Sequence, residues 1–341
     1  MADGAGGRQE TRIYTQLTDV MKEWGPGFNK TAFKMLQYAS RGSDIHLVSN
    51  CESVTDWDIS DTTNFNCVNE GTYIRTGSNS LEMVDGAAAE GYITLDDGRR
   101  PQGEDWGEYN WIGMWVYDDT ALRLTGELKV QIRNNLVWGA AMSVPVNTTA
   151  GVYEYKCIDM TGQARDRVDG FRFVNNRIGS AEKVYVDEII VTDLITGAGA
   201  GSTTLSAGPV IGPVREFPIK TGETMTPGLA CNWEGADGLC AAAADDTAIV
   251  GICCQDVPFT TLVAADATPK RCLVAMPGSI VIMRNGSSGA TLADGALLAS
   301  GVVTLTDATT NVIKSFARSL ETATANADTY FILTLQYQYA S

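Results

Sequence analysis

Short runs of alternating apolar and polar residues fill the chain from residue 47 onward. From Leu128 to Arg133 an apolar side chain occupies every second position, with a charged or amide side chain between. Phe171 and Phe173 flank Arg172 in the same way. A period of two is that of a strand with one buried face. Because Gly, Asn and Asp separate the runs, residues 47–195 are predicted to form an antiparallel β-sandwich.

A second block of short strands is predicted in residues 214–341. Pro-Gly pairs at 227–228 and 277–278 mark turns, and the connecting loops carry few charges, so this block is predicted to be a small β-barrel domain. Residues 196–213 are rich in Gly and Pro and are predicted to be a linker at the domain boundary. The expected strands are Val214–Lys220, Ala248–Cys254, Cys272–Met276, Ser279–Arg284 and Tyr330–Tyr339.

Residues 1–46 have a different pattern and are predicted to be a docking arm. After a Gly-rich start, Leu17, Val20, Met21 and Trp24 follow a helical spacing, and a second short helix is expected over Lys30–Tyr38. Two short helices cannot bury their apolar side chains alone, so the arm is expected to pack on another surface. The predicted class is all-β: an arm with short helices, a jelly-roll β-sandwich and a C-terminal small β-barrel.

Charge and hydropathy narrow the possible partners. The 341 residues include 41 Asp plus Glu and 25 Lys plus Arg, a formal charge of -16, so the chain is predicted not to bind nucleic acid. No apolar run approaches the roughly 20 residues that span a bilayer, and the first residues lack the basic and apolar regions of a signal peptide. We therefore expect no membrane partner and no secretion by its own signal.

The eight cysteines are sparse and form no Cys-x-x-Cys pair, so most are expected to be small buried apolar groups. The sequence leaves open whether Cys51 pairs with Cys67, and Cys231 with Cys240, in an oxidising compartment.

The inventory of catalytic groups argues against an enzyme. His46 is the only histidine, and it lies between Ile45 and Leu47 at the start of a predicted strand, as a packed or surface histidine would. The chain has no nucleophile elbow, phosphate-binding loop, zinc-protease helix or EF-hand motif. Acid pairs such as Asp96 and Asp97 are typical of solvated loops. Glycosidase acids are defined by distance in space, so a hydrolase stays as a third hypothesis.

Three segments in order, Leu47–Trp57, Gly71–Met83 and Val184–Val191, resemble a carbohydrate-binding-module jelly roll, and the resemblance covers nearly all of residues 47–195. In such modules a carboxylate of the first strand and an aspartate of the last often share a structural Ca²⁺, which implies Glu52 and Asp187 here. Asp187 also interrupts an apolar face, and a carboxylate there needs a partner. Ca²⁺, an arginine and an edge position are the alternatives.

An aromatic row on one predicted strand is the candidate glycan platform. Trp111, Trp115 and Tyr117 share a face, and aromatic faces stack on sugar rings. Packing in a core or interface is the favoured alternative for this row. Trp106, Tyr109 and Trp138 are further candidates, expected in loops.

The last block resembles, more loosely, the head-decoration proteins of tailed phages. This resemblance implies homotrimers that bind a major capsid protein on the outer surface of a virion. We therefore predict a non-enzymatic capsid decoration protein that also has a candidate glycan platform. The alternative is the glycan-binding module of a tail fibre or of a secreted polysaccharide-degrading system. The segments that carry the resemblance are Pro218–Ala230, Thr247–Cys253, Ser279–Met283 and Gly295–Leu298.

Overall fold

The structure is a computed structural model, and it confirms an all-β protein. The predicted arm helices and the last part of the predicted strand Tyr330–Tyr339 lie outside the described residues. No helix among the described residues is long and apolar enough to span a membrane. The structure describes residues 45–59, 65–85, 90–95, 103–175, 183–196, 208–220, 222–234, 238–241, 249–254, 271–286, 297–300, 305–307 and 315–334.

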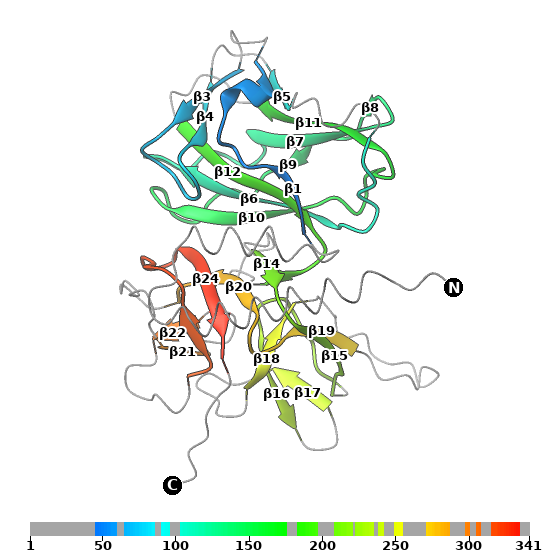
Figure 1. The fold of residues 1–341 in the computed structure, drawn as a ribbon, viewed down its shortest axis with the longest axis vertical. Coiled ribbons are helices and arrows are strands. Elements are labelled where there is room, and N and C mark those ends of the chain that lie inside the picture. Colours follow the sequence, from blue (N-terminus) through cyan, green and yellow to red (C-terminus); the bar gives the residue numbers. More distant parts are fainter. Residues whose placement is uncertain are drawn as a thin grey trace, which may run out of the picture.

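The first half is the predicted jelly-roll sandwich of two antiparallel sheets (Figure 1). Sheet A has the order β10-β6-β12-β4-β3, and β1 pairs with the second half of β12. Its strands are β1 (Ile45–Ser49), β3 (Phe65–Glu70), β4 (Ser80–Asp85), β6 (Trp111–Asp118), β10 (Tyr153–Asp159) and β12 (Lys183–Thr192).

Sheet B has the order β2-β5-β11-β7-β8, and β9 also pairs with β7. One short 3-10 helix, η1 (Val54–Asp56), leads into β2. The predicted alternation is confirmed in β7 and β11, where Val130, Ile132, Phe171 and Phe173 are buried against sheet A. The strands of sheet B are β2 (Trp57–Asp58), β5 (Gly91–Leu95), β7 (Leu128–Asn134), β8 (Val137–Trp138), β9 (Met142–Ser143) and β11 (Val168–Asn175).

The second half contains a seven-stranded sheet that packs on sheet A. The apolar run Ile280–Met283 explains its place, because both faces of this strand are covered. Ile280 and Ile282 face the sandwich, whereas Val281 and Met283 face the rest of the C-terminal half. In order, its strands are β13 (Ile195–Thr196), β14 (Gly208–Ile211), β20 (Ile280–Arg284), β24 (Asp328–Leu333), β23 (Ala317–Ser319), β21 (Leu297–Ser300) and β22 (Leu305–Asp307).

The remaining five strands form the predicted small barrel. The sheet closes where Ile219 bridges Leu239, and the Lys220 backbone N–H donates to the Leu239 carbonyl over 2.8 Å. Cys253, Cys272 and Val274 lie in the barrel core. The strand order is β15 (Val214–Pro218), β19 (Arg271–Ala275), β18 (Ile249–Cys253), β16 (Ala230–Glu234) and β17 (Gly238–Ala241).

The predicted linker differs from the structure. Gly208–Ile211 are fully buried as β14, between β13 and β20 of the seven-stranded sheet. The reason is close packing: a Cβ added at Gly208 would clash with the side chain of Ile282. The glycine that suggested a flexible linker in the sequence analysis is needed for the close packing of a buried strand.

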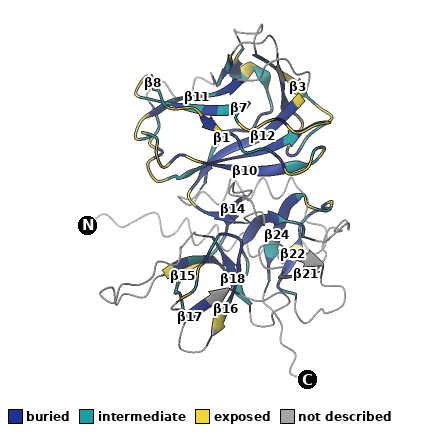
Figure 2. Ribbon diagram, turned by 180° about the vertical axis from the view of Figure 1, so that it is seen from behind, coloured by how far each residue is buried: buried dark blue, intermediate teal, exposed yellow. Residues whose placement is uncertain are grey.

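An apolar interface joins the two halves. Trp115 and Tyr155 of sheet A pack with Ile280, Ile282 and Tyr330 of the seven-stranded sheet. Figure 2 shows the strands at this junction, including β10, β12 and β14, coloured as buried. Since burying one large apolar side chain is worth roughly 1.5–3 kcal/mol, this interface holds the halves together strongly.

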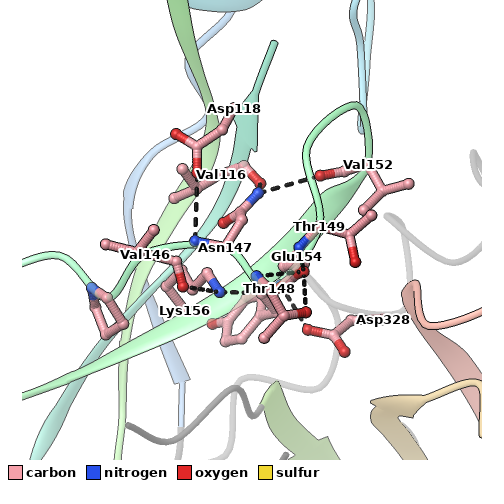
Figure 3. A network of polar contacts seen from close by, with 12 residues as sticks. Val116, Asp118, Val146, Asn147, Thr148, Thr149, Val152, Glu154, Lys156 and Asp328 are labelled. Carbon is pink, nitrogen blue, oxygen red and sulfur yellow. Dashed lines mark hydrogen bonds and ion pairs between the residues drawn. The ribbon is translucent and has the colours of Figure 1, made fainter. Parts of the chain in front are cut away.

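Buried ion pairs cross the same interface. Arg284 of β20 donates through Nη2 to Glu154 of β10 over 3.1 Å and through Nε to Asp328 over 3.0 Å. Asp328 in turn accepts from the Tyr155 backbone N–H, and Glu154 from Lys156 (Figure 3). Desolvation by burial would raise the pKa of Glu154, but Lys156 and Arg284 outweigh it and hold this pKa below its ordinary value.

Candidate functional site

The predicted aromatic row on β6 lies mostly in the interface between the halves. Trp115 is fully buried and donates from Nε1 to the Tyr330 hydroxyl over 3.2 Å. Trp111 and Tyr117 are half-buried at the two ends of β6. In this arrangement the ring of Trp115 faces the C-terminal half, which is the packing alternative. The predicted sugar stacking by Trp111 and Tyr117 stays a prediction.

The carboxylates of Glu52 and Asp187 both bind the connection between β3 and β4. Asp187 is fully buried and accepts from the backbone N–H groups of Arg75 and Thr76 and from the Thr76 hydroxyl, over 2.7–2.9 Å. Glu52 accepts from the backbone N–H groups of Ser78 and Asn79. Backbone and hydroxyl donors of this loop are therefore hydrogen-bond partners of Asp187, and the Arg75 side chain also attracts it electrostatically, so an arginine, one of the alternatives read from the sequence, takes part.

This donor set does not suit Ca²⁺ as it stands. Calcium takes six to eight oxygen ligands, whereas N–H and hydroxyl donors point at these carboxylates. Within the described ranges, no group of three or more His, Cys, Asp or Glu side chains is placed to hold a metal ion. The shared calcium stays a prediction, and the hydrogen bonds already satisfy both carboxylates.

His46 lies among packed side chains of the sandwich. Its Nε2 lies 3.0 Å from Glu104 Oε2, which also accepts from Trp106 Nε1, and the imidazole stacks on Tyr109. Trp106 is buried and Tyr109 packs against the sandwich core, so neither is an exposed loop aromatic.

The cysteines bear on the two disulfides that the sequence left open. Cys51, Cys67 and Cys231 are free, so the first of the two is not formed; the side chain of Cys240 lies outside the described part.

The outer face of sheet B carries a different aromatic row. Strand register places Thr94, Arg172 and Gln131 side by side, and Tyr92 and Lys129 in the next row across β11. Arg133 pairs with Trp138 of β8 in a third row. All seven side chains are half-buried, between solvent and the sheet. We call this set the outer face of sheet B.

A stack of three planar groups forms its centre. The Arg172 guanidinium lies 4.0 Å from the ring centre of Tyr92 and 4.1 Å from that of Trp138. Its Nε donates to Gln131 Oε1 over 2.7 Å, which fixes the plane of the guanidinium. A cation between two rings gains roughly 0.5–1 kcal/mol per ring at an exposed site. The stack is therefore held in one geometry before any ligand arrives.

A tight hairpin brings Trp138 to this face. Asn135 and Leu136, with φ values of 49° and 67°, form the two-residue turn between β7 and β8. Asp169 holds the turn, since its carboxylate accepts from the Leu136 backbone N–H over 2.8 Å and from Arg133 Nε over 2.7 Å. Trp138 then leans over Gly170, where a Cβ would lie 3.3 Å from its ring.

Trp138 was considered in the sequence only as a loop aromatic. The signal that could have found its place is the Asn134-Asn135 pair, which favours a hairpin turn and puts Trp138 opposite Arg133. Tyr92 and Arg172 gave no such signal, because their neighbours come from distant strands.

Comparison with known proteins finds matches only among solved structures. No protein-family model matches the chain, and no curated protein matches it in sequence. Solved structures that it resembles include a family 11 carbohydrate-binding module from Clostridium thermocellum, in complex with a β-1,3-1,4-mixed-linked tetrasaccharide. That match has 15% identity and a TM-score of 0.32, and it covers 44% of this chain and 95% of that one.

Two further matches are of the same kind. A family 30 carbohydrate-binding module has 15% identity and a TM-score of 0.29, over 43% of this chain and 83% of that one. A CBM29-2 mutant complexed with cellulohexaose has 8% identity and a TM-score of 0.28, over 44% and 90%. Each covers less than half of this chain.

Proposed function

We propose that this chain is a non-enzymatic glycan-binding protein, and that glycans bind the outer face of sheet B. The observation that carries the proposal is the stack of Tyr92, Arg172 and Trp138 on an accessible sheet face. Aromatic rings and flanking polar groups are the usual means of recognising sugars, through stacking on C–H faces and hydrogen bonds to hydroxyls. Gln131 and Thr94 supply such polar groups beside the stack.

The opposite face of the sandwich has less room for a ligand. Sheet A is covered by the seven-stranded sheet, and Trp115 at its centre is buried. Trp111 and Tyr117 are left as a second, smaller candidate contact at the rim of that interface.

The test is affinity electrophoresis of the full chain through gels that contain different polysaccharides. We expect Trp138→Ala and Tyr92→Ala to weaken retention about tenfold, the effect of one lost stacking contact. Trp233→Ala is the matched control, because Trp233 is an exposed tryptophan of the C-terminal half. Retention of both stack variants at the wild-type level, or lack of retention by every polysaccharide, would contradict the proposal.

We further propose that the protein displays this face on the outer surface of a virion, as a capsid decoration protein. The support is the sequence resemblance of residues 214–341 together with the layering. Because the C-terminal half covers sheet A, the outer face of sheet B lies on the opposite side of the sandwich from it (Figure 1). If the C-terminal half binds a major capsid protein, the outer face of sheet B points away from the capsid toward solvent.

Cosedimentation with empty capsid shells tests this setting. We expect the full chain to bind as a homotrimer and a chain without residues 1–40 to stay folded but lose binding, since the arm is predicted to be the anchor. Light scattering reports the number of copies. Unchanged capsid occupancy by the truncated chain would show that the arm is not the anchor, and no binding by the full chain would reject the decoration role.

A further inference from the structure

The outer face of sheet B holds two cations that make no direct ion pair among the described residues, although Glu90, which accepts from the Tyr92 hydroxyl, attracts Arg172 at longer range. Arg172 hydrogen-bonds only to the neutral amide of Gln131 and stacks on two rings, and Lys129 makes no ion pair, among the residues that the structure describes. By contrast, Arg133 on the same face pairs with Asp169. Two of the three cations of this face are therefore without a direct ion pair in the described part of the chain, and only Arg172 has an acid nearby.

Three cations against two acids, Glu90 and Asp169, give this face a small excess of positive charge, which is unusual for this molecule. The chain carries a formal charge of -16, so positive potential is not a general property of its surface. Long-range repulsion of an anionic ligand is screened beyond about 8 Å at physiological ionic strength, so contacts at the face decide binding. The same net charge disfavours nucleic acid, whose affinity depends on contacts with many phosphates.

The geometry of Arg172 suits hydrogen bonding to a carboxylate or sulfate group. With Nε held by Gln131 and the guanidinium packed on the rings of Tyr92 and Trp138, the terminal Nη groups make no hydrogen bond within the described residues. A guanidinium held in one plane donates two parallel hydrogen bonds to a carboxylate or sulfate. Lys129, one row away, adds a second cation at the spacing of neighbouring residues on a sheet face.

From these contacts we infer that the ligand is an acidic polysaccharide, with its carboxylate or sulfate groups on Arg172 and Lys129 and its sugar rings on Tyr92 and Trp138. This inference rests on the proposed glycan binding and names the class of glycan. A neutral glycan would leave both cations without a direct ion pair.

The experiment compares polymers that differ only in charge. Titration calorimetry of the full chain uses polygalacturonate against its methyl ester, and dextran sulfate against dextran. We expect about tenfold or tighter binding of one charged polymer over its neutral counterpart, since charge-assisted hydrogen bonds are worth roughly 1.5–3 kcal/mol. A difference within the polygalacturonate pair indicates recognition of carboxylates, and a difference within the dextran pair indicates recognition of sulfates.

Charge variants locate the contact. Arg172→Gln and Lys129→Gln should each weaken binding of the charged polymer about tenfold. Arg215→Gln, an exposed arginine on β15, should leave it unchanged. Equal binding of charged and neutral polymers overturns the inference but leaves the glycan proposal intact, whereas binding of no polymer rejects both. An equal loss in Arg215→Gln would show non-specific ion exchange and also overturn the inference.

Discussion

Glu154 is a buried acid of the interface between the halves. It is fully buried and accepts from Thr148, Thr149, Lys156 and Arg284. Removing one partner of a buried ion pair leaves an uncompensated charge, which costs about 3–5 kcal/mol. We expect Glu154→Gln to lower the free energy of unfolding by about this amount, as measured by urea denaturation at neutral pH.

The pH dependence of that loss has a definite sign. The folded-state pKa of Glu154 lies below its ordinary value of 4.5, so its contribution is present above that pH and is lost as the pH falls through the folded-state pKa. Burial raises the pKa of the neighbouring Asp328, Arg284 lowers it, and the charge of Glu154 adds to the rise. The burial and the Arg284 contact of Asp328 are kept in Glu154→Gln, and only the contribution of Glu154 is lost. Below pH 4.5 the wild type should lose stability more steeply than Glu154→Gln. Parallel curves would contradict this assignment.

The two tryptophans at opposite faces of the sandwich should respond differently to truncation. Trp115 is fully buried among Arg75, Tyr155 and Tyr330, so Trp115→Ala should cost about 3–5 kcal/mol of unfolding free energy. Trp138 is half-buried and packs on arginine side chains, so Trp138→Ala should cost about 1 kcal/mol or less. Thermal melting compares them directly, and similar losses would mean that Trp138 is part of the core.

The connection between β3 and β4 is the part of the chain that a Ca²⁺ ion held by Glu52 and Asp187 would affect. Its amides now satisfy Asp187 and Glu52, and a Cβ at Gly77 would clash with the Glu52 carboxylate. If Ca²⁺ is bound only by the folded state, the chain should melt at a higher temperature in calcium than in chelator, and Asp187→Asn should abolish the difference. Magnesium is the control. Equal melting temperatures for the wild type would reject the calcium site.

The hydrophobic pattern of a segment predicts some of the strands and misses others. Alternation in β7 and the continuous apolar run of β20 predicted strands correctly, because side-chain period and burial are tied by the pleat. β14 was missed because a Gly-Pro segment is packed only through its contact with Ile282, which comes 74 residues after Gly208 in the numbering of the chain. No local signal carries that contact.

For the whole molecule, the buried pair of Arg75 and Glu321 couples the two halves. Arg75 Nη1 donates to Glu321 over 2.7 Å while the guanidinium stacks on Trp115 and Tyr330. We expect one cooperative transition in calorimetry for the wild type and two separate transitions for Arg75→Gln, which leaves Glu321 buried without its arginine.

Two further variants control for this result. Arg75→Gln combined with Glu321→Gln should recover part of the stability, since neither charge is then left alone. Arg271→Gln breaks an exposed pair with Glu216 and should cost about 1 kcal/mol or less. A single transition in Arg75→Gln would mean that the apolar interface alone couples the halves.

The sequence by itself determined the all-β class, the sandwich and the small barrel, because strand period, turn residues and buried runs are local properties of the chain. Only the tertiary structure decided which aromatic residues meet solvent. Trp115 was a candidate until the C-terminal half covered it, and Tyr92, Arg172 and Trp138 became neighbours only through the register of four strands, β5, β11, β7 and β8. Burial and lateral contact depend on residues far apart in the chain, so the candidate site on sheet B could be found only in the folded molecule.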